Sequence, residues 1–294
     1  MKLDKDTLLS NLAPSELIEN VIKPDELEAL WKLAFTGGVP RKNAYGNIFI
    51  AGRESIIKKA YEIVKDRLGS IHGELFGGNY FITAQPYGVH IDSFSKENSN
   101  LNSPFGGIKK KNIINDNDYT VYRNVVIPLW VGGMKENQNT NAGKLVLMKQ
   151  RLVDYSCDLI GGENIENYKE SFYKGHTDYS ILQYYDAYGK QINKNLNSVK
   201  FDKELYEECL YHLPYTRLTG LTVENAFDWL PGNIMVLDGI QVHCSSLNKK
   251  NTTPESHDSI HTEYIHTEYN RMRTLSWINK MGLLLKFKVK VNGK

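Results

Sequence analysis

Residues 220–246 read GLTVENAFDWLPGNIMVLDGIQVHCSS, and this run predicts two β-strands separated by a tight turn. Pro231-Gly232 marks a turn at its centre, and NIMVL at 233–237 is a short apolar run typical of a buried strand. Asp238-Gly239 is a strong signal for a two-residue hairpin turn. The returning strand then carries His243, which is expected beside the end of a sheet.

A second candidate element lies upstream, at His90-Ile-Asp92. Residues 79–85 (NYFITAQ) alternate and are rich in aromatic and β-branched side chains, which favours a strand. Pro86-Tyr87-Gly88 then turns the chain, so His90 and Asp92 are expected at a strand edge. Another His-x-Asp pair, His176-Thr-Asp178, follows a polar stretch without strand periodicity, which indicates a solvated loop. The first pair is therefore the stronger candidate.

Two histidines and one carboxylate in this order can bind one face of the coordination octahedron of a ferrous ion. Neutral imidazoles and a carboxylate occupy three adjacent positions of an octahedron, and three positions remain for a bidentate 2-oxo acid and dioxygen. A lone histidine in a strand is more often a core residue bonded to a backbone carbonyl. The position of His243 after His90 and Asp92 favours the role of metal ligand, so an iron-dependent oxygenase is the first hypothesis.

With these motifs the chain resembles the superfamily of iron(II)- and 2-oxoglutarate-dependent oxygenases, over about Tyr80 to Ile278. The segment at 220–246 is similar to the run before the distal histidine in phage-like and marine-type members, and more distantly to phytanoyl-CoA and prolyl hydroxylases. The resemblance implies a mainly β fold with flanking α-helices, built on a double-stranded β-helix, the cupin-like jelly roll. It also implies that iron is bound by His90, Asp92 and His243. The other segments that carry it are FITAQPYGVHIDS, VVIPLWV, GKLVLMKQ and RMRTLSWI.

The resemblance further implies an arginine that binds the far carboxylate of 2-oxoglutarate. Arg271 and Arg273 lie two residues apart and would share one face of a strand. We favour Arg273, because Leu275 and Trp277 continue the alternation on its side, and a guanidinium fork fits a carboxylate. The chain departs from the family pattern in two ways: residues 249–270 are inserted before the arginines, and neither arginine is followed two positions later by serine.

The implied reaction is hydroxylation of an organic substrate, coupled to conversion of 2-oxoglutarate and dioxygen to succinate and carbon dioxide. Oxidative demethylation is the next outcome, and the carboxylate of Asp92 favours either one over halogenation. We expect a small metabolite as substrate. The alternatives are a nucleobase-modifying oxygenase with the same mechanism, a zinc hydrolase that uses the same three residues, and a non-redox metal-binding jelly roll without turnover.

The length of 294 residues fits one oxygenase domain with embellishments. Apolar periodicity predicts helices over 24–35 and 53–68, as part of a helical buttress at 1–78. The β-helix core is expected at 79–153 and 229–294. The intervening residues 154–228 form an insertion, with a helix at 202–212, that we expect to act as a substrate lid. Strands are expected at 79–85, 121–131, 144–150, 233–237, 240–244, 274–278 and 283–291, with Pro128 at an edge or a bulge.

Composition and charge indicate which partners and which cellular compartment to expect. The net charge of +2 gives no strong argument for a polyanionic partner, so binding to nucleic acid is not favoured. Lys286, Lys288 and Lys290 alternate with apolar residues, which predicts the solvated face of a C-terminal strand. Three cysteines without a C-x-x-C pair indicate reduced thiols and a cytoplasmic location. No stretch is long and apolar enough to cross a membrane or to act as a signal peptide.

Overall fold

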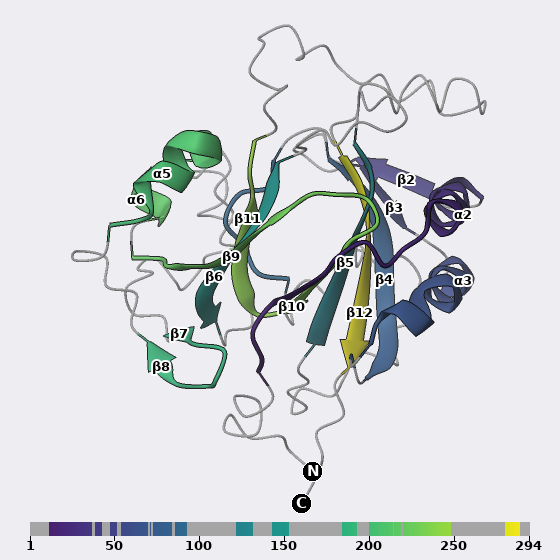
Figure 1. Cartoon of the computed structure of the whole chain (residues 1–294), viewed down its shortest axis with the longest axis horizontal. Coiled ribbons are helices and arrows are strands. Elements are labelled where there is room, and N and C mark those ends of the chain that lie inside the picture. Colours follow the sequence, from purple (N-terminus) through teal and green to yellow (C-terminus); the bar gives the residue numbers. More distant parts are fainter. Residues whose placement is uncertain are drawn as a thin grey trace, which may run out of the picture.

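Two β-sheets pack face to face, and helices α2 (Pro24–Phe35) and α3 (Glu54–Val64) lie against one of them (Figure 1). This arrangement comes from a computed structural model. It describes residues 12–36, 39–42, 48–51, 54–69, 71, 73–83, 86–92, 122–131, 143–152, 184–192, 200–213, 215–218, 220–247 and 280–288.

The larger sheet has seven antiparallel strands in the order β1-β10-β5-β12-β4-β3-β2. Pro128 lies in β5, an interior strand, at a point where the pairing register with β12 shifts between Met281 and Gly282. The prediction of an edge or a bulge is confirmed as a bulge, which accommodates the missing N–H of proline. The strands are β1 (Glu16–Ile18), β10 (Ile234–Asp238), β5 (Tyr122–Val131), β12 (Lys280–Lys288), β4 (Glu74–Thr83), β3 (Ile48–Ala51) and β2 (Val39–Lys42).

The smaller sheet follows the order β11-β6-β7-β8, with β9 also paired to β6. Its strands are β11 (Gln241–Ser245), β6 (Lys144–Leu152), β7 (Tyr184–Tyr185), β8 (Gln191–Ile192) and β9 (Val223–Asp228). Residues 87–92 run along the free side of β11, where His90 and His243 exchange two backbone hydrogen bonds of 2.9 Å. This segment therefore serves as a fourth long element of the smaller sheet.

The order in which the chain visits the two sheets defines the fold. Apart from the short strands β7 and β8, which extend the smaller sheet between β6 and β9, it passes from β4 in the larger sheet to residues 87–92 in the smaller one, then to β5, β6, β9, β10, β11 and β12. The larger sheet thus receives β4, β5, β10 and β12, and the smaller sheet receives the other four. This alternation is a double-stranded β-helix, so the predicted jelly-roll fold is confirmed.

The predicted hairpin at Asp238-Gly239 is wrong. Strand β10 pairs with β1 and β5, whereas β11 pairs with β6 in the other sheet. The turn therefore carries the chain across from one sheet to the other. An Asp-Gly pair fixes the local backbone turn but does not determine the partner of the strand that follows.

Between the helices and the larger sheet lies a helix-side cluster of buried apolar residues. It includes Leu30 of α2, Ile57 and Val64 of α3, and Val125 and Leu285 of the sheet. Both predicted helices are confirmed, and α3 continues as a 3₁₀ turn at Lys65–Arg67 (η1). Each helix turns its apolar stripe toward the sheet, which leaves its charged face to solvent.

A second, inter-sheet cluster joins the inner faces of the two sheets. Val126, Met235 and Leu284 from the larger sheet meet Leu147 from the smaller one, together with Trp229. Residues two apart on a strand share a face, so Asn124 and Lys286 also lie on this inner side. The space between the sheets is therefore apolar in its middle and polar at one end.

The back of the smaller sheet is covered by residues from within the predicted insertion. Leu210 and Leu218 pack against Val146, Val242 and Cys244. The predicted helix at 202–212 appears as one turn of α5 (Lys203–Leu205) continued by a π-helical segment, η4 (Tyr206–Leu210), and α6 (Tyr215–Leu218) follows. Strand β9, which also lies within the predicted insertion, pairs with β6 and so forms part of the smaller sheet. Residues 154–183, 193–199, 214 and 219 of the expected lid lie outside the described residues.

The prediction that Lys286 lies on a solvated strand face is wrong. Lys286 is 3% exposed, and Lys280 on the same side of β12 is 4% exposed. The opposite side carries Met281, Leu283 and Phe287, which belong to the helix-side cluster. The alternating sequence therefore correctly predicted a strand with two different faces. It did not predict that both faces are buried. The side chain of Lys288 and the whole of Lys290 lie outside the described residues.

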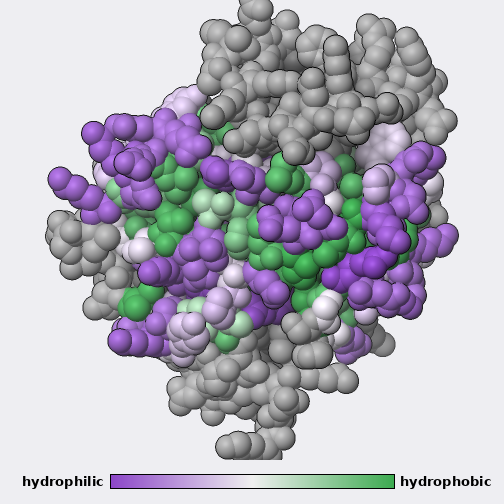
Figure 2. All heavy atoms as spheres, in the orientation of Figure 1, coloured by the Kyte–Doolittle hydropathy of each residue, from purple (hydrophilic) through white to green (hydrophobic). Residues whose placement is uncertain are grey.

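Hydrophobic residues are visible at the centre of the face in Figure 2, with hydrophilic residues on both sides. Among the described residues, the large hydrophobic side chains classed as exposed are Tyr188 and Tyr211. Most apolar side chains of the described residues thus pack in the three buried clusters, namely the helix-side cluster, the inter-sheet cluster and the one behind the smaller sheet. None of the described helices has the length and apolar character needed to span a membrane.

Candidate metal centre

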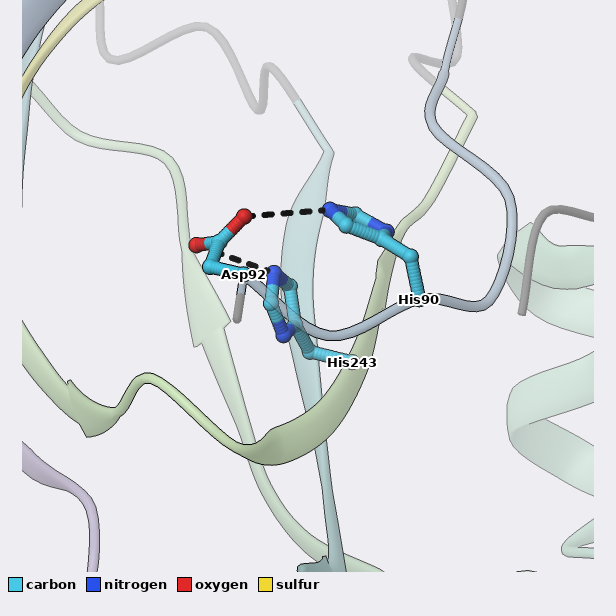
Figure 3. Close-up of side chains that lie close together, drawn as sticks. All are labelled: His90, Asp92 and His243. Carbon is cyan, nitrogen blue, oxygen red and sulfur yellow. Dashed lines mark ion pairs between the residues drawn. The ribbon is translucent and has the colours of Figure 1, made fainter. Parts of the chain in front are cut away.

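The fold brings His90, Asp92 and His243 together at one end of the space between the sheets. His243 lies on β11, and the other two residues lie on the segment that pairs with it. One possible ligand atom from each residue lies within 4.8 Å of the others. The three side chains point toward a common point (Figure 3). His90 and His243, which are 153 positions apart in the chain, thus lie side by side.

Backbone carbonyls orient both imidazole rings. Nδ1 of His90 lies 2.8 Å from the carbonyl oxygen of Gly88, and Nδ1 of His243 lies 2.8 Å from that of Gln241. Because a carbonyl oxygen can only accept, each Nδ1 must donate its proton. Each neutral ring therefore keeps an unprotonated Nε2, which is the atom that can bind a metal.

The Nε2 atoms face the carboxylate between them. Nε2 of His90 lies 3.8 Å from Oδ1 of Asp92, and Nε2 of His243 lies 3.7 Å from Oδ2. These separations are too long for hydrogen bonds. They are also below about 4 Å, the largest distance between two atoms that each lie about 2 Å from one ion. Adjacent ligands of an octahedral ion lie about 3 Å apart, so the side chains would draw together around a bound metal.

Burial and charge keep the residues in the protonation states that a metal requires. Burial, followed by the nearby charge of His90, lowers the pKa of His243 to about 4, so its ring is neutral at pH 7. Burial opposes the charge of Asp92, but His243, Lys286 and His90 and a hydrogen bond from Asn124 outweigh it and lower the pKa of the carboxyl. At neutral pH the site therefore offers a neutral imidazole nitrogen from His243 and an anionic oxygen from Asp92.

Two polar residues of the larger sheet hold Asp92 in place. Nδ2 of Asn124 donates to Oδ2 of Asp92 at 2.9 Å, and Nζ of Lys286 donates to its backbone oxygen at 2.9 Å. Sequence reasoning missed both residues. Asn124 could have been noticed as a polar residue that opens the apolar run NVVIPLW, whereas the face that carries Lys286 was expected to be solvated.

The other predicted site residues cannot be placed in this arrangement. Arg271 and Arg273 lie outside the described residues, as do the alternative pair His176 and Asp178. Their roles stay predictions.

The strand order and the meeting of the three residues are the two features that can be compared with known proteins. The chain has the fold and the H-x-D…H constellation of the iron(II)- and 2-oxoglutarate-dependent oxygenases. No family model matches the chain, and no curated protein matches it.

Among solved structures, the chain is similar to EvdO2 from Micromonospora carbonacea var. aurantiaca in complex with 2-oxoglutarate. The two share 12% identity and a TM-score of 0.35, over 99% of this chain and 94% of that one. It is also similar to the apo form of EctD from S. alaskensis, with 12% identity and a TM-score of 0.36, over 98% of this chain and 77% of that one. At this level of similarity, the fold assignment rests on the strand order described above.

Proposed function

We propose that the chain is an iron(II)- and 2-oxoglutarate-dependent dioxygenase that hydroxylates a small organic substrate. The observation that carries the proposal is the arrangement of His90, Asp92 and His243, in which both Nε2 atoms face one carboxylate. A two-histidine, one-carboxylate face with open positions is the donor set of non-haem iron(II) oxygenases. Iron and 2-oxoglutarate are part of the proposal.

The donor set fits iron(II) because two imidazoles and one carboxylate bind on one side and leave the other side open. When bound, iron(II) supplies activation of dioxygen with 2-oxoglutarate as the reductant. The balanced reaction converts R–H, dioxygen and 2-oxoglutarate into R–OH, succinate and carbon dioxide. The residues of this chain hold the ligand atoms in place, and the buried strands around His243 exclude water from one side of the site.

Turnover without a known substrate offers a direct test. The chain loaded with iron(II) is expected to convert 2-oxoglutarate slowly to succinate in air, and a true substrate should accelerate this conversion. A panel of amino acids, small acids and single-stranded oligonucleotides separates a small substrate from the nucleobase alternative. Succinate formation by the Asp92→Ala variant at the wild-type rate would contradict the proposal. Zinc-dependent hydrolysis without succinate would indicate the hydrolase instead.

The cosubstrate anchor is a separate part of the proposal and rests on the sequence. Arg273→Ala is expected to raise the 2-oxoglutarate concentration needed for half-maximal turnover by about 30-fold or more, because truncating one member of a desolvated ion pair costs about 2 kcal/mol or more. Iron binding should persist. Arg271→Ala should have a milder effect. Titration of succinate formation against 2-oxoglutarate measures both.

Lys286→Met is the comparison variant for the two arginines, because Lys286 is a basic residue whose amine donates to the backbone oxygen of Asp92. We expect it to weaken metal binding rather than to change the requirement for 2-oxoglutarate selectively. A larger effect from Arg271→Ala would transfer the anchor to Arg271. A selective effect from Lys286→Met alone would transfer it to Lys286.

We further propose that the protein acts in the cytoplasm and that the insertion at 154–228 contributes a substrate lid, as its sequence predicts. Two described cysteines, Cys209 and Cys244, are free and buried, which suits a reducing compartment.

A further inference from the structure

Asn124 occupies an unusual position for a polar side chain. It lies on β5 in the middle of the larger sheet, where it pairs with Leu237 on one side and Lys286 on the other. It is completely buried, and it shares the inner face with Val126 of the inter-sheet cluster. Its Nδ2 donates to Oδ2 of Asp92 at 2.9 Å. The amide thus reaches from one sheet to a candidate metal ligand carried by the other.

The second half of this amide has no partner among the described residues. Oδ1 of Asn124 is buried and accepts no hydrogen bond there. An unsatisfied buried oxygen is destabilising, and a valine or leucine at this position would avoid that cost. The contact that asparagine gains in exchange is the one to Asp92.

The backbone of Asp92 is already fixed without Asn124. Its N–H donates to the carbonyl oxygen of Gly239 at 2.9 Å, and its own carbonyl oxygen accepts from Lys286 at 2.9 Å. What remains is rotation of the side chain about Cα–Cβ, and of the carboxylate about Cβ–Cγ, a torsion with broad preferences. Asn124 restrains this rotation, because a turn of the carboxylate plane would move Oδ2 away from Nδ2.

We propose that Asn124 is a positioning residue that keeps Asp92 bound to the metal through a single oxygen. A carboxylate that chelates with both oxygens takes two coordination positions. The hydrogen bond from Asn124 engages Oδ2 and leaves Oδ1, the oxygen nearer Nε2 of His90, as the single ligand atom. Asn124 thereby preserves the open position that a bidentate cosubstrate and dioxygen together require. The inference rests on the proposed function only in requiring that a metal binds at this site.

Cobalt(II) tests the inference without turnover and without 2-oxoglutarate. The Asn124→Ala variant is expected to bind cobalt(II) about 10- to 100-fold more weakly than the wild type, as second-layer partners of metal ligands generally do. Its visible cobalt spectrum should change in shape and intensity, because the coordination number changes. Asn124→Ser, which keeps a polar group too short to reach Asp92, should give the same result. Calorimetric and optical titrations measure both properties.

Asn79→Ala is the matched control. Asn79 is 3% exposed on β4, which lies beyond β12 from β5 in the same sheet, and its amide donates to the backbone oxygen of Tyr80. It removes a buried amide from the same sheet, so cobalt affinity and spectrum should stay as in the wild type.

Two further outcomes separate this inference from the metal site itself. Wild-type cobalt affinity and spectrum in both Asn124 variants, together with loss of cobalt binding in Asp92→Ala, would overturn the positioning role and leave the site intact. Cobalt binding that survives Asp92→Ala would overturn the site and the inference together.

Discussion

His243→Ala is expected to abolish metal binding, and with it the weak visible band that an anaerobic complex of iron(II) and 2-oxoglutarate should show. His243 is 4% exposed, and its Nε2 lies 3.7 Å from Oδ2 of Asp92. The alanine variant retains two of the three ligand atoms and creates an apolar gap in which nothing replaces the lost nitrogen. Titration with iron(II) under argon, followed by addition of 2-oxoglutarate, measures both effects.

His212→Ala is the control, because His212 is a partly buried histidine that does not belong to the candidate site. It should bind iron(II) as the wild type does. If His176→Ala removed the band while His90→Ala left it unchanged, the metal would bind at the other His-x-Asp pair and the assignment would be wrong.

Arg151→Ala is expected to lower the free energy of unfolding by about 3 to 5 kcal/mol, since it removes one of the two cationic partners of the buried Asp238 and the cationic partner of Glu224. Arg151 and Asp238 are both completely buried, with Nε of the first 3.2 Å from Oδ2 of the second. Arg151 also donates to Glu224 of β9 at 3.1 Å and to the carbonyl oxygen of Ala13 at 3.1 Å. Arg123 adds a second contact to Asp238 at 2.9 Å.

This ion cluster ties together both sheets and the N-terminal segment at the turn that leads to β11. Urea unfolding at pH 7 measures the loss. Lys32→Ala breaks the exposed pair between Lys32 and Glu28, whose side chains are 60% and 61% exposed, and should cost less than about 1 kcal/mol. Similar small losses in both variants would show that the buried cluster is structurally dispensable.

The sequence predicted most of the core strands and the three residues that meet. Strand β5 was expected at 121–131 and lies at Tyr122–Val131, and α2 lies at the predicted residues. These features depend on local periodicity and on turn residues, which a single sequence contains. The convergence of His90 and His243 followed from the family resemblance, since nothing local to either residue fixes a contact across 153 positions.

The predictions that failed depend on the partner of a strand rather than on the strand itself. Asp238-Gly239 indicated a turn but not that the next strand would join the other sheet. Lys286 alternates with apolar residues in the pattern of a half-exposed strand, yet its amine is buried and donates a hydrogen bond to the backbone oxygen of Asp92. Strand β9 was not expected, because its sequence VENAFD is polar and resembles an inserted loop. One of its polar residues, Glu224, belongs to the buried ion cluster.

The place of β12 in the sheet has a consequence for synthesis on the ribosome. This strand, at residues 280–288, is the last described element in sequence, yet it lies between β5 and β4 and pairs with both along its length. As the chain emerges, β4 and β5 have no partner on these sides until residue 288 has been made.

During that interval the nascent chain presents two unpaired strand edges and an apolar face that only β12 completes. Such edges are templates for wrong pairing between chains. The strand also joins segments that are about 200 and 160 residues earlier, as 284 − 79 = 205 and 284 − 126 = 158, and pairing over such separations is slow. Production of this protein should therefore depend strongly on chaperones that bind extended apolar segments, and slower synthesis at low temperature should increase the soluble yield.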